Sequence, residues 1–291
     1  MSVQRATALA ILVGLVSYPS TVRGGAPMGL PIAALEEGQW SVGLGYGYGE
    51  ADYEASGLNV QYPDGSSPTY AAEFIDLNGY RTRVALGSFA YGICDNWDLF
   101  ARLGFCDGRD RLSIHTAPPS GSPERVSLDG DTGLAWGLGT RATFCHWGPW
   151  RFGGLIQITW LDPDSSRYTS SDPDVADTVW AGDVDIEFWQ TQVALAAVYQ
   201  IDTLSFWAGP FLEFVEGDLD RSGRILVDGA DAGRFTSSAD IQETAQLGLH
   251  AGINWEATAK IDCRLEGQWT RDSWFFGVSG VMRPDQWFGQ P

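Results

Sequence analysis

The sequence predicts an all-β fold, a transmembrane antiparallel up-and-down β-barrel of about ten strands (within a range of about 8–12). Three observations predict it. Large apolar residues alternate with glycine or serine early in the chain, long and short connections alternate between the expected strands, and no stretch after the N-terminus is apolar enough for a transmembrane helix. Any membrane embedding must therefore come from strands.

Composition narrows the possible functions. The net charge is −19, with 18 Lys and Arg against 37 Asp and Glu, and 44% of the residues are apolar. The apolar fraction excludes a disordered chain, and the acidic balance argues against nucleic acid as a partner because phosphate contacts need a basic surface. The acidic residues are compatible with divalent cations or with long solvated loops.

The N-terminus predicts a secretory signal peptide. Arg5 precedes a short apolar core at 6–17, and small residues around Gly24 suggest cleavage there. The apolar core is too short to span a bilayer as a helix. The expected organisation is a signal peptide (1–24), a periplasmic lead-in (25–37), the barrel (38–283) and a short C-terminal tail (284–291).

The stretch from Gln39 to Gly49 shows the clearest strand pattern. One face carries Trp40, Val42, Leu44, Tyr46 and Tyr48, and the other carries Ser41, Gly43, Gly45, Gly47 and Gly49. A period of two with these faces is typical of a strand with lipid on one side and a crowded barrel interior on the other. We expect the glycine face to make room for arginines, so that Gly45→Leu or Gly47→Leu impairs assembly and Val42→Leu does not.

The remaining strands follow from alternating apolar residues between turn signals. Expected strands cover 39–51, 77–89, 97–105, 133–144, 150–160, 186–199, 204–215, 244–255, 261–269 and 273–283, with long loops at 52–73, 106–131, 161–185 and 216–240. Pro210 is an objection to its strand because proline removes a ladder hydrogen bond. Long loops on one side and short turns on the other, with Trp or Tyr near strand ends, are typical of membrane barrels.

Two segments resemble Gram-negative outer-membrane β-barrel proteins. Residues 91–102 are similar to a turn and following strand of these proteins, and residues 35–40 to their first-strand entry. The likeness runs over 35–283 and implies location in the cell outer membrane, with lipid and the barrel assembly machinery as partners. The alternative is a secreted soluble β-barrel, which would hydrate one face of its sheet. The glycine-rich second face favours the membrane barrel.

Polar residues on the inward faces are the candidate functional residues. The lumen-facing candidates are Arg81, Arg83, Arg102, Arg141, Gln157, Gln192, Gln246, His250, Arg264, Glu266 and Gln268. They could form a charged constriction that selects solutes. We favour the alternative, a structural network in which Arg264 and Glu266 take part, because buried charges must pair.

The long connections carry closely spaced acids. Candidate metal ligands are Asp162, Asp164, Asp172, Asp174, Asp218 and Asp220, which could bind Ca²⁺. The stretch from 218 resembles the first half of a calcium loop, but Gly229 occupies the position that needs a bidentate Glu. The alternative, which we favour, is a set of solvated acidic loops with no cofactor.

Cysteine and histidine placement suggests no catalysis. Cys94 and Cys145 fall in turns on one side and are the candidate disulfide pair, whereas Cys106 and Cys263 have no evident partner. None of the three histidines (His115, His146 and His250) accompanies a nucleophile motif, so we expect no enzyme.

The predicted function is a small porin-like channel, or a structural barrel, with long acidic extracellular loops. Small solutes would be partners if it is a pore. The alternative is a surface binding or adhesion protein that acts through its loops.

Overall fold

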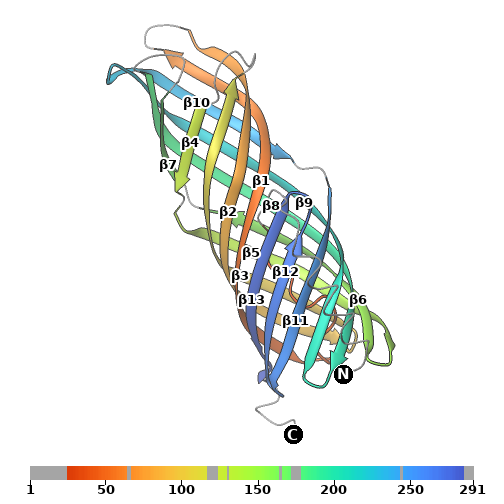
Figure 1. The fold of residues 1–291 in the computed structure, drawn as a ribbon. Helices are drawn as coiled ribbons and strands as arrows, with labels where there is room; N and C mark the ends of the chain where they lie inside the picture. The colour runs from red at the N-terminus through yellow and green to blue at the C-terminus, as the bar shows by residue number, and fades with distance from the viewer. Residues whose placement is uncertain are drawn as a thin grey trace, which may run out of the picture.

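The computed structural model describes residues 25–63, 67–116, 124–129, 131–163, 166–171, 178–242 and 245–284. These residues form thirteen strands of one antiparallel sheet (Figure 1). The strands are β1 (Trp40–Pro63), β2 (Thr69–Cys94), β3 (Trp97–Thr116), β4 (Glu124–Asp129), β5 (Gly133–Trp147), β6 (Trp150–Asp162), β7 (Ser166–Ser171), β8 (Thr178–Ile201), β9 (Leu204–Val227), β10 (Ala230–Gln242), β11 (Gln246–Thr258), β12 (Ile261–Trp269) and β13 (Ser273–Met282). Among the described residues, none lies in a helix that is long and apolar enough to cross a membrane.

Ten of these strands close into a ring, which we call the membrane ring. Pairing runs from β1 through β2, β3, β5, β6, β8, β9, β11, β12 and β13 and returns to β1. Each neighbouring pair is antiparallel, and the turns at one end are short. The predicted up-and-down barrel of about ten strands is confirmed.

The long connections, in contrast, are mostly strands and not loops. Beyond the membrane ring, β1, β2, β3, β8 and β9 continue, β10 pairs with both β9 and β1, and β4 and β7 lie side by side between β3 and β8. These eight strands form a second, narrower tube, the outer ring, at the upper end of Figure 1. The prediction of loops at 52–73, 106–131, 161–185 and 216–240 is therefore wrong for most of the described residues in these stretches. Acids between buried apolar residues, such as those flanking the fully buried Leu219, made a strand look like a solvated loop.

The outside of the membrane ring is apolar on every strand. Exposed large side chains include, in strand order, Leu44, Phe89, Leu103, Leu138, Ile156, Leu195, Leu212, Leu249, Leu265 and Val278. Such a continuous apolar surface around a closed ring is the lipid-facing band of a membrane barrel. The protein is a transmembrane β-barrel, and its outer ring stands on the side away from the short turns.

Aromatic residues mark both edges of this band. At the short-turn end lie Trp40, Tyr91, Trp97, Trp147, Trp150, Tyr199 and Trp255, and at the other end lie Tyr48, Trp136, Trp160, Trp189, Trp269 and Trp274. Trp136 and Trp189 meet edge to face with ring centroids 5.2 Å apart. Strands tilted by about 45° rise about 24 Å over the ten residues between two such positions, which matches the usual height of the apolar band.

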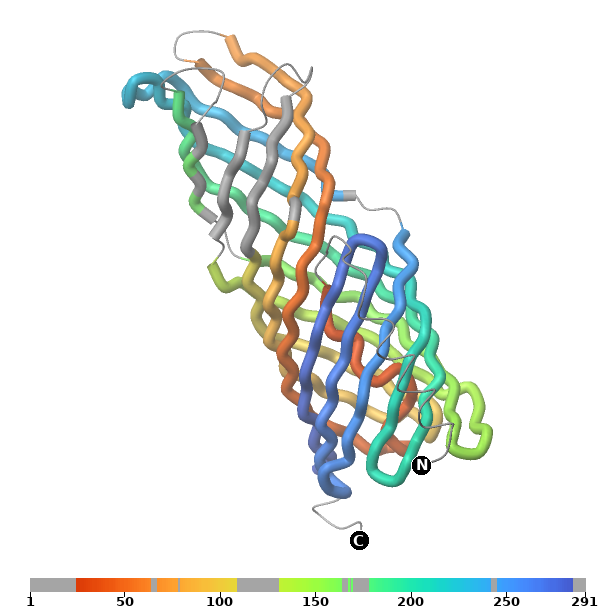
Figure 2. Tube along the Cα trace, viewed as in Figure 1, coloured from red at the N-terminus to blue at the C-terminus, as the bar shows by residue number. Residues whose placement is uncertain are grey.

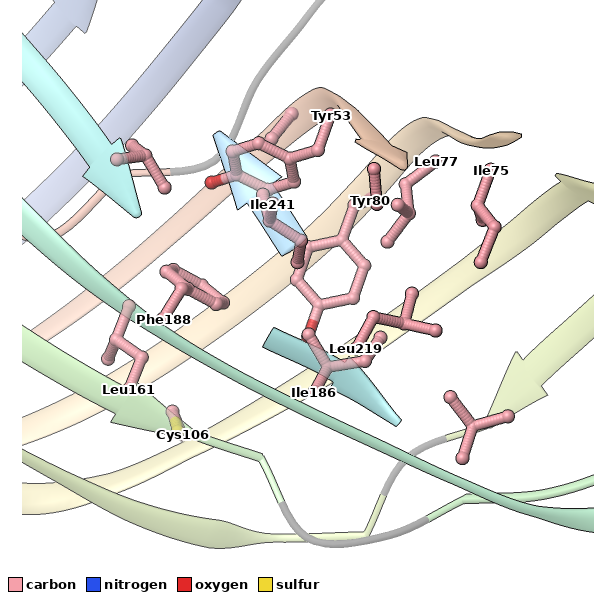
Figure 3. Packing of buried hydrophobic residues seen from close by; sticks show 14 of the residues in the cluster. Tyr53, Ile75, Leu77, Tyr80, Cys106, Leu161, Ile186, Phe188, Leu219 and Ile241 are labelled. Atoms are coloured by element: carbon pink, nitrogen blue, oxygen red, sulfur yellow. The ribbon is translucent and has the colours of Figure 1, made fainter. Parts of the chain in front are cut away.

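The main hydrophobic core lies inside the outer ring. Tyr53, Tyr80 and Phe188 pack together there, with ring centroids 5.7–6.2 Å apart. Ile75, Leu77, Leu161, Ile186, Leu219 and Ile241 surround them, each at most 6% exposed (Figure 3). The outer ring therefore has a packed apolar interior, like that of a soluble barrel.

The glycine face of β1 points inward as predicted, but an aromatic ring fills the space it leaves. A Cβ on Gly47 would lie 2.0 Å from Cζ of Phe275, and one on Gly49 would lie 3.1 Å from the same ring. Phe275 is only 2% exposed. The expectation that arginines occupy this space is wrong, because the nearest large side chain comes from the neighbouring strand β13.

Replacing Gly47 with alanine is expected to destabilise the barrel by about 1–3 kcal/mol, because the enclosed ring of Phe275 has to move. The measurement is the temperature at which the folded band of the heat-modifiable protein converts to the unfolded band. Gly45→Ala is the control, since its Cβ would meet Ser279 at an ordinary 3.4 Å. Equal losses for both variants would contradict this assignment.

Candidate functional site

The interior of the membrane ring is occupied by the chain's own N-terminal segment, which we call the strap (residues 25–37). Figure 2 shows it in red, passing inside the ring of strands before β1 begins. Ala26, Met28, Ile32 and Leu35 are each at most 4% exposed. We expected a lead-in ahead of the barrel, and the structure instead places its first eleven residues within the lumen.

Polar side chains of four strands hold the backbone of the strap. Gln190 on β8 and Gln268 on β12 bond the N–H and the carbonyl of Ala26 at 2.8 and 3.0 Å. Glu266 accepts from the Gly29 N–H at 2.6 Å. Arg102 on β3 donates to the carbonyl of Met28 at 2.8 Å, and Gln157 on β6 donates to that of Pro27 at 3.2 Å. Buried backbone groups need such partners, so the lumen is complementary to this segment.

Apolar contacts fix the strap as well. Met28 and Leu35 pack in a cluster with Phe100, Leu155 and Phe211. Nearer the short-turn end, Leu30 and Ile32 pack against Val198 and Trp207. The strap thus buries four large side chains in the lumen, and this burial excludes water from the space it occupies.

A buried ion pair ties the strap to the wall near the short turns. Asp98 Oδ2 lies 2.9 Å from Nε of Arg141, with the two side chains 0% and 8% exposed. The same oxygen accepts from the Ala34 N–H at 2.8 Å. One carboxylate therefore serves the barrel wall and the strap together.

Most of the predicted lumen residues do face the interior. Arg141, Gln157, Gln192, His250, Arg264, Glu266 and Gln268 are buried, and Arg102 reaches the strap. Gln192 bonds Gln157 and Gln268, which links β6, β8 and β12. Arg264 pairs with Asp262 at 3.7 Å and bonds Asn254, whereas Glu266 bonds the strap, so both belong to a structural network.

Arg81 and Arg83 are not lumen residues. Their side chains are 61% and 47% exposed and pair with Glu50 and Asp107 on the outer surface. Tyr80, Val84 and Leu86 alternate with the arginines, and we assigned their apolar face to lipid. Tyr80 in fact belongs to the core of the outer ring, so the faces of this part of β2 are reversed.

His250 has a structural partner. The ladder between β8 and β9 is interrupted opposite Gly209 and Pro210, which leaves the Leu195 carbonyl outside it. The His250 imidazole lies 3.1 Å from that carbonyl, reaching it across Gly209. Pro210 is thus tolerated because a side chain replaces the ladder bond.

A second buried charge cluster, which the sequence did not reveal, lies inside the outer ring. Glu73 on β2 and Arg221 on β9 pair with each side chain 1% exposed. Ser237 on β10 and Asn59 on β1 also bond the Glu73 carboxylate. The cluster joins four strands, and one of them, β10, belongs to the outer ring alone.

The three predicted metal ligands that the structure describes, Asp162, Asp218 and Asp220, do not gather into a site. Asp218 and Asp220 lie on the outer face of β9 and Asp162 ends β6, whereas Asp164, Asp172 and Asp174 lie outside the described residues. Within the described ranges, no group of three or more His, Cys, Asp or Glu is placed to hold a metal ion.

The four cysteines are free thiols, so the structure does not form the Cys94–Cys145 disulfide. Cys106 lies in the core of the outer ring, and burial raises the pKa of its thiol to about 12. It therefore stays protonated and unreactive at neutral pH. Of the histidines, His146 is exposed near the end of β5, and His115 lies in a stretch of β3 whose backbone alone is described.

Several solved structures match this chain over most of its length. The outer membrane protease OmpT from Escherichia coli matches with a TM-score of 0.44 and 9% identity, covering 83% of this chain and 94% of that one. The outer membrane protein OprG from Pseudomonas aeruginosa matches with a TM-score of 0.41 and 10% identity, covering 85% of this chain and 96% of that one. The toluene transporter TbuX from Ralstonia pickettii matches with a TM-score of 0.40 and 13% identity, covering 91% of this chain and 95% of that one. No protein-family model matches the sequence, and no curated protein matches it.

Proposed function

We propose that the protein is a closed outer-membrane barrel that acts at the cell surface through its outer ring, as a binding or adhesion protein. The single observation that carries this proposal is that the interior is filled at two successive levels. The strap occupies the membrane ring, and packed apolar side chains occupy the outer ring. In this proposal the chain has no catalytic role, and it reaches the membrane through the barrel assembly machinery.

Of the two filled levels, the outer ring is the one that most clearly closes the barrel. A path for hydrophilic solutes needs a lumen that water can wet, and well-packed apolar interiors stay dry. Tyr53, Tyr80 and Phe188 meet in the interior at the base of the outer ring, where such a path would have to pass. The long strands above the membrane then serve to carry an exposed surface and not to lead solutes inward.

A small porin-like channel is the second candidate, and one observation favours it. Where the strap lies, the wall of the membrane ring is lined by Gln157, Gln192 and Gln268, which are groups that water could solvate. In that case the strap would act as a plug, and small solutes would be the partners.

Conductance of the intact protein in planar lipid bilayers separates the two functions. We expect no steady current steps from protein that shows heat-modifiable migration and is therefore folded, under conditions in which a general porin conducts. Reproducible conductance steps from the intact protein would overturn the closed-barrel proposal and support the channel.

A further inference from the structure

The outer surface of the outer ring has two unlike halves. Strands β8, β9 and β10 carry the exposed carboxylates Asp185, Glu187, Asp218, Asp220 and Asp240. Strands β1 and β2 carry exposed apolar side chains, with Leu58 47%, Tyr70 66% and Phe74 51% exposed. These apolar residues lie beyond Tyr48 and the rest of the aromatic edge, so lipid does not cover them.

The strand register brings the two halves into continuous rows. One row runs across Glu187, Asp218, Asp240, Ser56 and Phe74, and the next across Asp185, Asp220, Ser238, Leu58 and Ala72. Each row therefore begins with carboxylates on β8 and β9 and ends with an apolar side chain on β2. We call this surface the two-part face.

Both halves are energetically unfavourable in the free protein. Directly opposite residues on neighbouring strands have Cβ atoms about 4.5–5.5 Å apart, and like charges there are destabilising. Asp218 faces a carboxylate on each side, Glu187 on β8 and Asp240 on β10. Beside them, an aromatic and aliphatic patch is left in water. A partner with positive charge and apolar side chains would relieve both costs at once.

We propose that the two-part face docks an extended segment of a cationic protein, with a basic block over β8–β10 and an apolar block over β1–β2. Charge complementarity selects this occupant, because the chain as a whole carries −19 and this face concentrates carboxylates. Five strands span about 19 Å, at about 4.8 Å per strand. An extended segment of about six residues covers that width. This inference rests on the proposed surface-binding function and names its partner class.

The test uses the full-length protein in nanodiscs of zwitterionic lipid and a fluorescent synthetic peptide, Lys-Arg-Lys-Leu-Tyr-Leu. A shuffled peptide of the same composition, Lys-Leu-Arg-Tyr-Lys-Leu, is the control for partition into lipid. We expect the block peptide to bind at least tenfold more tightly than the shuffled one, and added salt to weaken its binding. Equal binding of the two peptides, or no measurable binding of either, would overturn the docking proposal.

Variants locate the site on the two-part face. We expect Asp218→Asn and Phe74→Ser each to weaken binding of the block peptide at least about fivefold, a change of about 1 kcal/mol. The matched control is Asp228→Asn, which makes the same charge change in the exposed hairpin turn between β9 and β10, where Asp228 has φ 51°. Asparagine suits that turn, so this variant folds. Equal weakening by Asp218→Asn and Asp228→Asn would contradict the assignment. Failure here leaves the conductance result untouched, so it is distinguishable from failure of the closed-barrel proposal.

Discussion

Glu73→Ala is expected to lower the free energy of unfolding by about 3–5 kcal/mol, which is the usual cost of removing one partner of a buried ion pair. The substitution leaves the guanidinium of Arg221 inside the outer ring without the carboxylate that it contacts in the structure. It also removes the acceptor of Ser237 and Asn59. Because these residues come from four strands, we expect the outer ring to open before the membrane ring does.

Limited proteolysis of folded protein in detergent measures this effect, with cleavage expected in the outer ring while the membrane ring stays heat-modifiable. The control is Arg81→Ala, which breaks an exposed pair worth less than about 1 kcal/mol. A double variant, Glu73→Met with Arg221→Met, should recover most of the stability because apolar residues of similar size can replace a buried pair. Full protease resistance of Glu73→Ala would show that the pair does not hold the outer ring together.

Deleting residues 25–36 is expected to let water into the membrane ring without producing a channel. The deletion removes the groups that cover Gln157, Gln190 and Gln268, so water enters from the short-turn end. The core around Tyr53, Tyr80 and Phe188 is unaffected by the deletion and still closes the other end.

Labelling of an introduced thiol detects this change. In a background without the four native cysteines, Gln192→Cys is buried, since Gln192 is 0% exposed. The strap deletion should raise its reaction rate with a charged maleimide at least about tenfold, because access no longer requires local opening. Thr203→Cys, in an exposed short turn, should react equally in both proteins. Unchanged labelling would mean that the strap does not exclude water, and steady conductance of the deletion protein would mean that the outer ring is not closed.

The membrane ring could be predicted from the sequence because its pattern is local. Alternation at 39–49 placed Leu44 toward lipid and Gly47 toward the interior, and the structure confirms both. The same alternation placed Arg141, Gln192 and Glu266 on the inward face, and the structure shows all three buried. Lipid on one side and a filled lumen on the other leave a clear two-residue period in each strand.

The outer ring and the strap could not be predicted because their signals depend on distant residues. Alternation of apolar and acidic residues at Asp218, Leu219 and Asp220 indicates a strand only when the partners that bury Leu219 are known. The strap has no period, and its backbone partners lie far along the chain, as with Gly29 and Glu266. The outward position of Arg81 was missed for the same reason, since the core around Tyr80 forms only when β8 is in place.

Five strands run unbroken through both rings, and this has a mechanical consequence. Because β1, β2, β3, β8 and β9 continue from the short turns to the far tip, no linker or hinge interrupts these five strands between the two rings. A pull on the tip is carried along the strands as shear across many hydrogen bonds that share the load, and not by opening the ladders one bond at a time. The outer ring is thus a stiff extension of the membrane ring that holds a bound partner at a fixed height above the lipid.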